Sequence, residues 1–117
     1  MSEHQFALQK ILSLLQADEL ASLGPETRAN REPLQILENK LRRAFSETKF
    51  SESSQTLIRS LVLLWHDYLD ESHSISQEIH SSDGSFLHGI MHRREPDYGN
   101  AKYWFHRVGG HSSYPIL

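Results

Sequence analysis

The sequence predicts an all-α fold: a small bundle of about five helices with a long central helix and a short antiparallel partner. Three observations support this prediction. Apolar residues recur every three or four positions, and no segment shows the strict alternation that is typical of a strand. Clusters of Gly, Pro, Ser, Asp and Asn interrupt the pattern at a few places. The length of 117 residues fits one all-α domain over residues 1–117.

The first predicted helix begins at a capping box. Ser2 and Gln5 have the spacing at which each side chain satisfies a free backbone amide of the other residue. Apolar residues then recur at helical intervals until Gly24-Pro25 stops the helix. Asn30 is the expected cap of a second helix, whose apolar stripe ends at Phe45.

The third predicted helix is the long one, from about Ser54 to His80. A Ser- and Asp-rich turn follows, in which Asp83 or Ser85 would cap the next helix. That short helix covers Phe86–Glu95, and Pro96 ends it because the residue before a proline is pushed out of helical geometry. The tight turn predicts that these two helices are antiparallel.

The composition excludes several classes of protein. The net charge of −3 argues against a nucleic-acid partner, which needs a basic face. No apolar run approaches the ~20 residues of a membrane span. The chain has no cysteine, which removes disulfides and thiolate metal sites and favours a cytoplasmic location. Residues 1–84 carry 8 Lys/Arg against 13 Asp/Glu, whereas residues 85–117 carry 4 against 2, so we expect any small anionic partner at the C-terminal end.

Three histidines of the predicted long helix are spaced by seven. His66, His73 and His80 would therefore share one stripe beside the apolar face. Seven residues rise ~10.5 Å, too far for two of these side chains to bind one ion. The stripe predicts a groove, in which His66 lies nearest to the loop that carries Asp97 and Asn100.

A second set of histidines has the spacing of a shared site. His88 and His92 are four apart on one helix face, and Glu95 follows three later. Folding the antiparallel partner back places His73 opposite His92, so their side chains should lie within ~10 Å of each other. Such donors suit divalent zinc, iron or manganese. The spacing leaves open a metal site, a metal-free polar pocket or simple structural hydrogen bonding. Gly89 stands where the motif His-Glu-x-x-His has its general base.

The last predicted helix adds aromatic and basic residues. Asn100 caps it, and Gly109-Gly110 end it after Val108. Arg107 lies four residues after Tyr103 and three after Trp104. At this spacing its guanidinium can stack on one of the rings or hold a ligand anion in its planar fork. The residues that we expect to bind a ligand are His66, Arg93, Asp97, Asn100, Tyr103, Trp104 and Arg107. For Asp97 and Asn100, a role in turns and caps is the simpler interpretation.

Residues 88–104, HGIMHRREPDYGNAKYW, resemble the signature of a family of small microbial proteins with no established activity. Its members carry His-x-x-x-His-Arg-x-Glu-x-Asp-x-x-Asn-Ala-x-Tyr-Trp, followed by basic residues and a glycine. The similarity covers about Trp65 to His111, and His106 stands where the pattern has a second arginine. The resemblance implies a site at this string and supplies no chemistry.

Three functions remain open from the sequence. In a metal-dependent enzyme, His73, His88 and His92 would hold the ion, and Glu95 would be the fourth ligand or the general base. A non-catalytic protein would bind a small anionic or sugar-like molecule in the same pocket. Alternatively, an interaction module would use the C-terminal aromatic and arginine face to dock a partner or a second copy of the chain.

Overall fold

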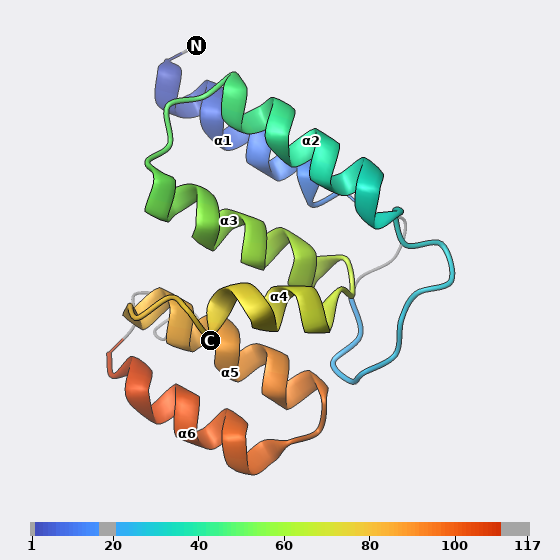
Figure 1. Cartoon of the computed structure of the whole chain (residues 1–117), viewed down its shortest axis with the longest axis vertical. Coiled ribbons are helices and arrows are strands. Elements are labelled where there is room, and N and C mark those ends of the chain that lie inside the picture. Colours follow the sequence, from blue (N-terminus) through green and yellow to red (C-terminus); the bar gives the residue numbers. More distant parts are fainter. Residues whose placement is uncertain (1, 17–20, 111–117) are drawn as a thin grey trace.

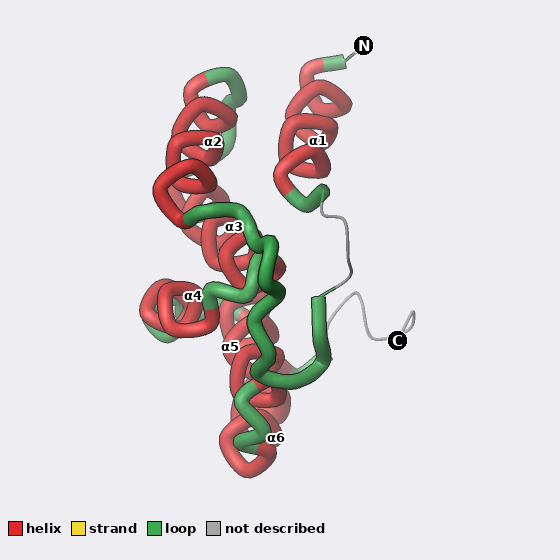
Figure 2. The backbone as a smooth tube through the Cα atoms, turned by 90° about the vertical axis from the view of Figure 1, so that its right-hand side faces the viewer, coloured by secondary structure: helices red, strands yellow, loops and turns green. Residues whose placement is uncertain are grey.

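The computed structural model describes residues 2–16 and 21–110, and within these ranges the protein is all-helical, as predicted (Figure 1). Its helices are α1 (Glu3–Leu14), α2 (Leu34–Ser46), α3 (Glu52–Trp65), α4 (Leu69–Ser76), α5 (Ser82–Arg94) and α6 (Tyr98–Val108). Helices α1 and α2 lie at one end and α5 and α6 at the other, with α3 and α4 between them (Figure 1 and Figure 2). None of these helices combines the length and the apolar character that a bilayer-spanning helix needs.

Two apolar clusters meet along α3. The larger cluster joins α1, α2 and α3, and its fully buried members include Leu37, Leu41 and Leu63. The smaller cluster places Leu64 of α3 against the buried Met91 of α5. Helix α3 therefore has an apolar side for each end of the molecule, and it fixes α5 relative to the N-terminal helices.

The predicted central helix from about Ser54 to His80 is divided into two helices. The backbone leaves the helix at Trp65, and Asp67 adopts a left-handed conformation with φ 71°. Aspartate is among the few non-glycine residues that tolerate this region. A separate eight-residue helix, α4, then starts at Leu69. The apolar repeat continues across the break, which is why periodicity alone does not reveal it.

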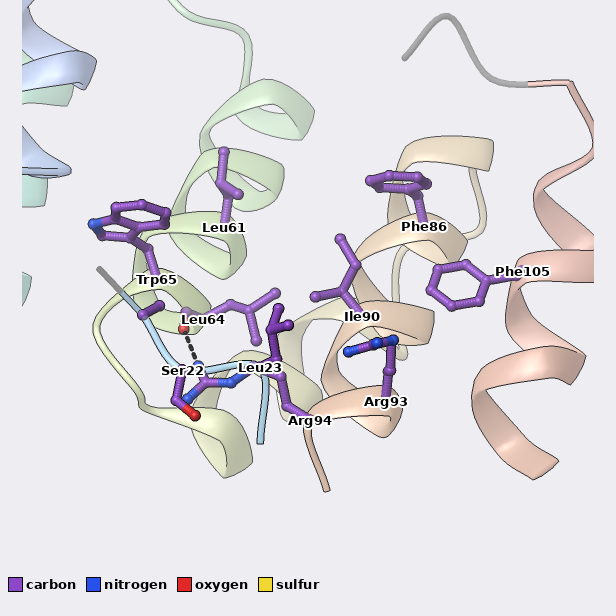
Figure 3. A pocket seen from close by; sticks show the side chains of 11 residues that line it. Ser22, Leu23, Leu61, Leu64, Trp65, Phe86, Ile90, Arg93, Arg94 and Phe105 are labelled. Carbon is purple, nitrogen blue, oxygen red and sulfur yellow. Dashed lines mark hydrogen bonds between the residues drawn. The ribbon is translucent and has the colours of Figure 1, made fainter. Parts of the chain in front are cut away.

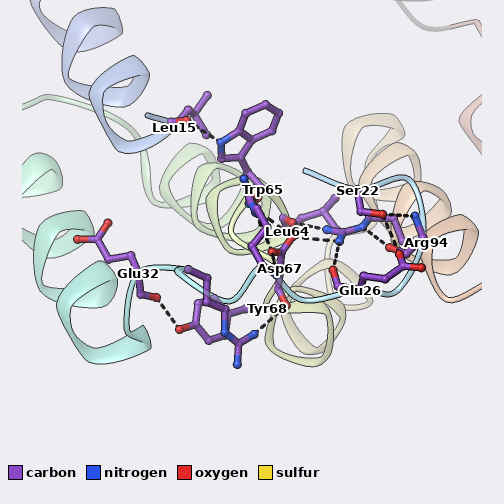
Figure 4. Close-up of polar contacts among 12 residues, drawn as sticks. Leu15, Ser22, Glu26, Glu32, Leu64, Trp65, Asp67, Tyr68 and Arg94 are labelled. Atoms are coloured by element: carbon purple, nitrogen blue, oxygen red, sulfur yellow. Dashed lines mark hydrogen bonds and ion pairs between the residues drawn. The ribbon is translucent and has the colours of Figure 1, made fainter. Parts of the chain in front are cut away.

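A buried ionic cluster explains the break (Figure 4). The Asp67 carboxylate is 1% exposed and accepts hydrogen bonds from the backbone amide and Nε of Arg28, both at 2.8 Å, and from Nη2 of Arg94 at 3.0 Å. Burial alone would raise the pKa of Asp67, but the hydrogen bonds from the two arginines outweigh it and lower that pKa. The cluster ties the segment before α2 to the α3–α4 junction and to the end of α5.

The capping box at Ser2 and Gln5 is confirmed, with both reciprocal hydrogen bonds present. Helix α1, however, ends at Leu14, well before Gly24-Pro25. Residues 17–20, which include the last apolar residue of the predicted helix, Leu20, lie outside the described residues. The second helix begins at Leu34, after Pro33, so Asn30 does not cap it.

The N-caps of α5 and α6 differ from the predicted ones. Ser81 caps α5 through the amide of Gly84, so the helix starts earlier than a cap at Asp83 or Ser85 would allow. Asp97 caps α6 by accepting from the amide of Asn100 at 3.3 Å, so Asn100 is a donor to the cap instead of the cap itself.

Candidate metal centre

Three histidines from two helices converge on one point. His73 lies in the last turn of α4, while His88 and His92 lie one turn apart on the same face of α5. One ring nitrogen from each residue can be chosen so that all three atoms lie within 4.8 Å of one another. The ring centroids of His88 and His92 are 4.8 Å apart, with the two rings nearly parallel. Helical spacing thus brings two imidazoles together, and the return of the chain adds the third.

The predicted proximity of His73 and His92 is confirmed, with ring centroids 5.3 Å apart. His88 is closer to His73, at 4.6 Å. The sequence predicts a turn centred near residue 82 or 83. In the structure the chain reverses a few residues earlier, between Ser76 and Ser82. This earlier reversal shifts the pairing toward His88.

The cluster contains buried nitrogen atoms that lack hydrogen-bond partners. His88 is 3% exposed and His92 is 9% exposed. Both ring nitrogens of His88 and Nδ1 of His92 are buried without a hydrogen bond. A buried polar atom with no partner costs about 1–3 kcal/mol, so three such atoms in one place mark the cluster as a candidate ligand site.

Burial keeps His88 neutral. Removal from solvent, helped by the charges of His73 and His92, lowers the pKa of His88 from 6.5 to about 4. Its lone pair is therefore free at neutral pH, which is the protonation state that a metal ligand requires.

Helix α6 forms the wall of the cluster. The indole of Trp104 stacks on the imidazole of His88, with centroids 3.9 Å apart and an interplanar angle of 17°. Tyr103 meets the indole edge-on at 5.3 Å. The guanidinium of Arg107 lies 5.3 Å from the centroid of Trp104 and donates to the hydroxyl of Tyr103 at 3.2 Å. A fixed positive charge thus lies one ring away from the histidines.

Two carboxylates lie on the solvent side. Oε1 of Glu95 is 3.3 Å from Nδ1 of His92 without forming a hydrogen bond, and Oδ2 of Asp97 is 3.9 Å from the same nitrogen. The side-chain amide of Asn100 donates to Asp97 at 2.7 Å. Hydrogen bonds from Asn100 lower the pKa of Asp97, with a smaller contribution from His92. Asp97 therefore caps α6 and also borders the cluster, while Asn100 holds its carboxylate in place.

The structure separates two predicted residues from this cluster. His66 is buried at the end of α3, where its Nε2 is 2.6 Å from the carbonyl oxygen of Leu14, so it joins α3 to the N-terminal segment. The predicted groove of His66, His73 and His80 does not form, because the helix breaks between the first two; His80 is exposed. Arg93 is also exposed and lines an apolar pocket on the other side of α5.

Sequence reasoning missed the role of Arg94. This residue is 5% exposed and belongs to the ionic cluster at Asp67, where it also donates to the carbonyl oxygens of Gly24 and Leu64. Nothing in the spacing separates it from Arg93, since both are arginines at the end of one helix. The partner segment is about 70 residues away along the chain, and periodicity cannot reveal such a contact.

Comparison of the chain with models of known protein families, with curated proteins and with solved structures gives no significant match. The resemblance of residues 88–104 to a microbial family thus stays a prediction, and function has to be inferred from the geometry of the site.

Proposed function

We propose that the protein binds one divalent transition metal ion through His73, His88 and His92. The observation that carries the proposal is the convergence of three imidazoles whose buried nitrogens include three without a hydrogen-bond partner. Nitrogen donors without a thiolate favour zinc, with iron or manganese as alternatives. A metal ion would bind one nitrogen of each ring, and at His88 this nitrogen would gain a partner that the protein itself does not provide.

The donor separation is compatible with such an ion. With metal–nitrogen distances of ~2.1 Å and tetrahedral angles, two ligand nitrogens lie ~3.4 Å apart. In the protein the chosen nitrogens already lie within 4.8 Å of one another. Binding would therefore require shifts of roughly 1–2 Å, which rotations of the imidazoles about their side-chain bonds can supply.

The chain also has residues suited to support the ion. A histidine that binds a metal commonly donates its other N–H to a carboxylate. The Glu95 carboxylate, 3.3 Å from Nδ1 of His92, is placed for this role once the ring adjusts. The same carboxylate lies on the solvent side, where it can accept a proton from water in the open coordination position.

Three protein ligands with one open position are typical of catalytic zinc sites. The substrate class that we propose is a small anion, because the guanidinium of Arg107 borders the cluster through Trp104. Tyr103 orients that guanidinium by accepting its hydrogen bond. The proposed activity is thus metal-dependent chemistry of a small anion, with water activated at the ion.

Calorimetric titration of the untagged, metal-stripped protein with Zn²⁺ tests the proposal. We expect a stoichiometry of one, with at least tenfold weaker binding in His92→Ala. His80→Ala is the matched control because His80 is an exposed histidine in the turn before α5. Equal weakening in both variants, or unchanged binding in His92→Ala, would contradict the assignment.

A further inference from the structure

A cavity lies against the face of α5 that carries Phe86, Ile90 and Arg93 (Figure 3). Its volume is about 760 Å³, which is within the range of small-molecule binding pockets. Its walls come from α3, α5, α6 and the segment that follows α1, and its main apolar residues are Leu23, Leu61, Trp65, Phe86, Ile90 and Phe105.

The pocket is built on fixed elements. Arg94 donates from Nε to the carbonyl oxygen of Gly24 at 3.0 Å and from Nη1 to that of Leu64 at 2.9 Å, so it holds the segment after α1 against α3. On the opposite wall, Phe105 of α6 packs against Gly89, where a Cβ atom would come within 2.7 Å of the ring. None of the three histidines lines the pocket. The cavity is therefore preformed and independent of any metal.

The charges at the pocket favour an anionic group. Arg93 is exposed, forms no hydrogen bond or ion pair with the described part of the chain, and turns its guanidinium toward Ile90 (Figure 3). Arg94, by contrast, is engaged on every nitrogen. The nearby carboxylate of Glu26 accepts from the hydroxyl of Ser22 at 2.8 Å. The cation that remains available to a ligand is Arg93.

We propose that this pocket binds a small amphipathic carboxylate, with its hydrocarbon part among the apolar side chains and its carboxylate on Arg93. The apolar walls supply burial at roughly 25 cal/mol per Å² of hydrocarbon surface. The planar guanidinium fork fits a carboxylate in a bidentate geometry. This site goes beyond the proposed metal centre, because its residues face away from the three histidines and its ligand does not contact the ion.

Titration with three straight-chain amphiphiles tests the proposal. Decanoate, decanol and decyltrimethylammonium have closely similar hydrocarbon tails and differ in the head group. We expect saturable binding of one decanoate, with an affinity that decreases about threefold to tenfold in Arg93→Gln, as for a partly exposed charged hydrogen bond. Decanol should bind wild-type protein and Arg93→Gln alike, and the ammonium should bind most weakly. Arg43→Gln, at an exposed arginine of α2, is the matched control and should leave decanoate binding unchanged.

A second variant tests the apolar wall. Leu61 is 37% exposed, so Leu61→Glu should fold while it brings a negative charge into the pocket. We expect it to abolish decanoate binding and to leave Zn²⁺ binding intact, which keeps this proposal distinguishable from the metal centre. The proposal is overturned if decanoate binds no more tightly than decanol, if Leu61→Glu binds decanoate normally, or if a self-associated form of the chain covers this face and excludes the probe.

Discussion

Replacing His88 by leucine should stabilise the metal-free protein. A neutral imidazole has one N–H donor and one acceptor, and in His88 both are buried without a partner. Each such atom costs about 1–3 kcal/mol, and leucine removes both. The substitution loses the stacked contact with Trp104, which is worth about 0.5–1.5 kcal/mol. We therefore expect the free energy of unfolding of His88→Leu to exceed that of the wild type by roughly 0.5–5 kcal/mol.

Urea unfolding of both proteins, first with a chelator and then with excess Zn²⁺, measures the free energy of unfolding of the metal-free and the metal-bound states. At a free metal concentration of 100 times the dissociation constant, binding should stabilise the wild type by about 2.7 kcal/mol and His88→Leu by far less. The order of stability should thus approach equality or reverse when metal is added. A metal-free His88→Leu protein that is less stable than the wild type by more than ~1 kcal/mol would refute the reasoning, because His88 would then be a favourable core residue.

Further predictions concern pH, charge and glycine. The pKa of His88 is about 4 in the folded protein and 6.5 when unperturbed, so between these values the unfolded state binds a proton that the folded state does not. The stability of the wild type should therefore decrease as the pH falls from 6.5 toward 4, and the advantage of His88→Leu in urea unfolding should grow over the same window; an advantage that stays constant across it would contradict this. Asp67→Ala should lower the free energy of unfolding by about 3–5 kcal/mol, since it leaves the buried Arg28 and Arg94 without their anion. A free energy from thermal unfolding within about 1 kcal/mol of the wild-type value would contradict this. Gly89→Ala should lower the free energy of unfolding by about 1–3 kcal/mol, because its Cβ would meet the ring of Phe105 at 2.7 Å. Gly99→Ala, with open space around it in the first turn of α6, should be neutral or stabilising by up to ~1 kcal/mol. Equal effects of the two substitutions in thermal melts would contradict the role of the Phe105 contact.

The fold class was predictable because helical periodicity is local. The cap at Ser2 and the end of α5 near Pro96 depend on neighbours within a few residues, and both agree with the sequence. The break at Asp67 depends on Arg28 and Arg94, which lie 39 and 27 residues away. A pattern of apolar spacing carries no information about such a pairing, so the long helix appeared continuous.

The candidate site was predictable to the extent that it rests on two helices and a tight reversal. The spacing of His88 and His92 and the return of the chain place His73 with them, and the structure shows this arrangement. The sequence did not separate Arg93 from Arg94, since their environments are set by the segment after α1 and by α3. His66 was assigned to the site only because the helix break was not foreseen.

The metal content of the untagged protein tests the central claim most directly. Elemental analysis by mass spectrometry, after purification without chelators and after reconstitution with Zn²⁺, should give about one transition metal per chain. The ratio should fall close to zero in His73→Ala and His92→Ala, while His80→Ala retains it. A wild-type protein that holds less than about one tenth of an equivalent after reconstitution would contradict the account of the three histidines as a metal centre.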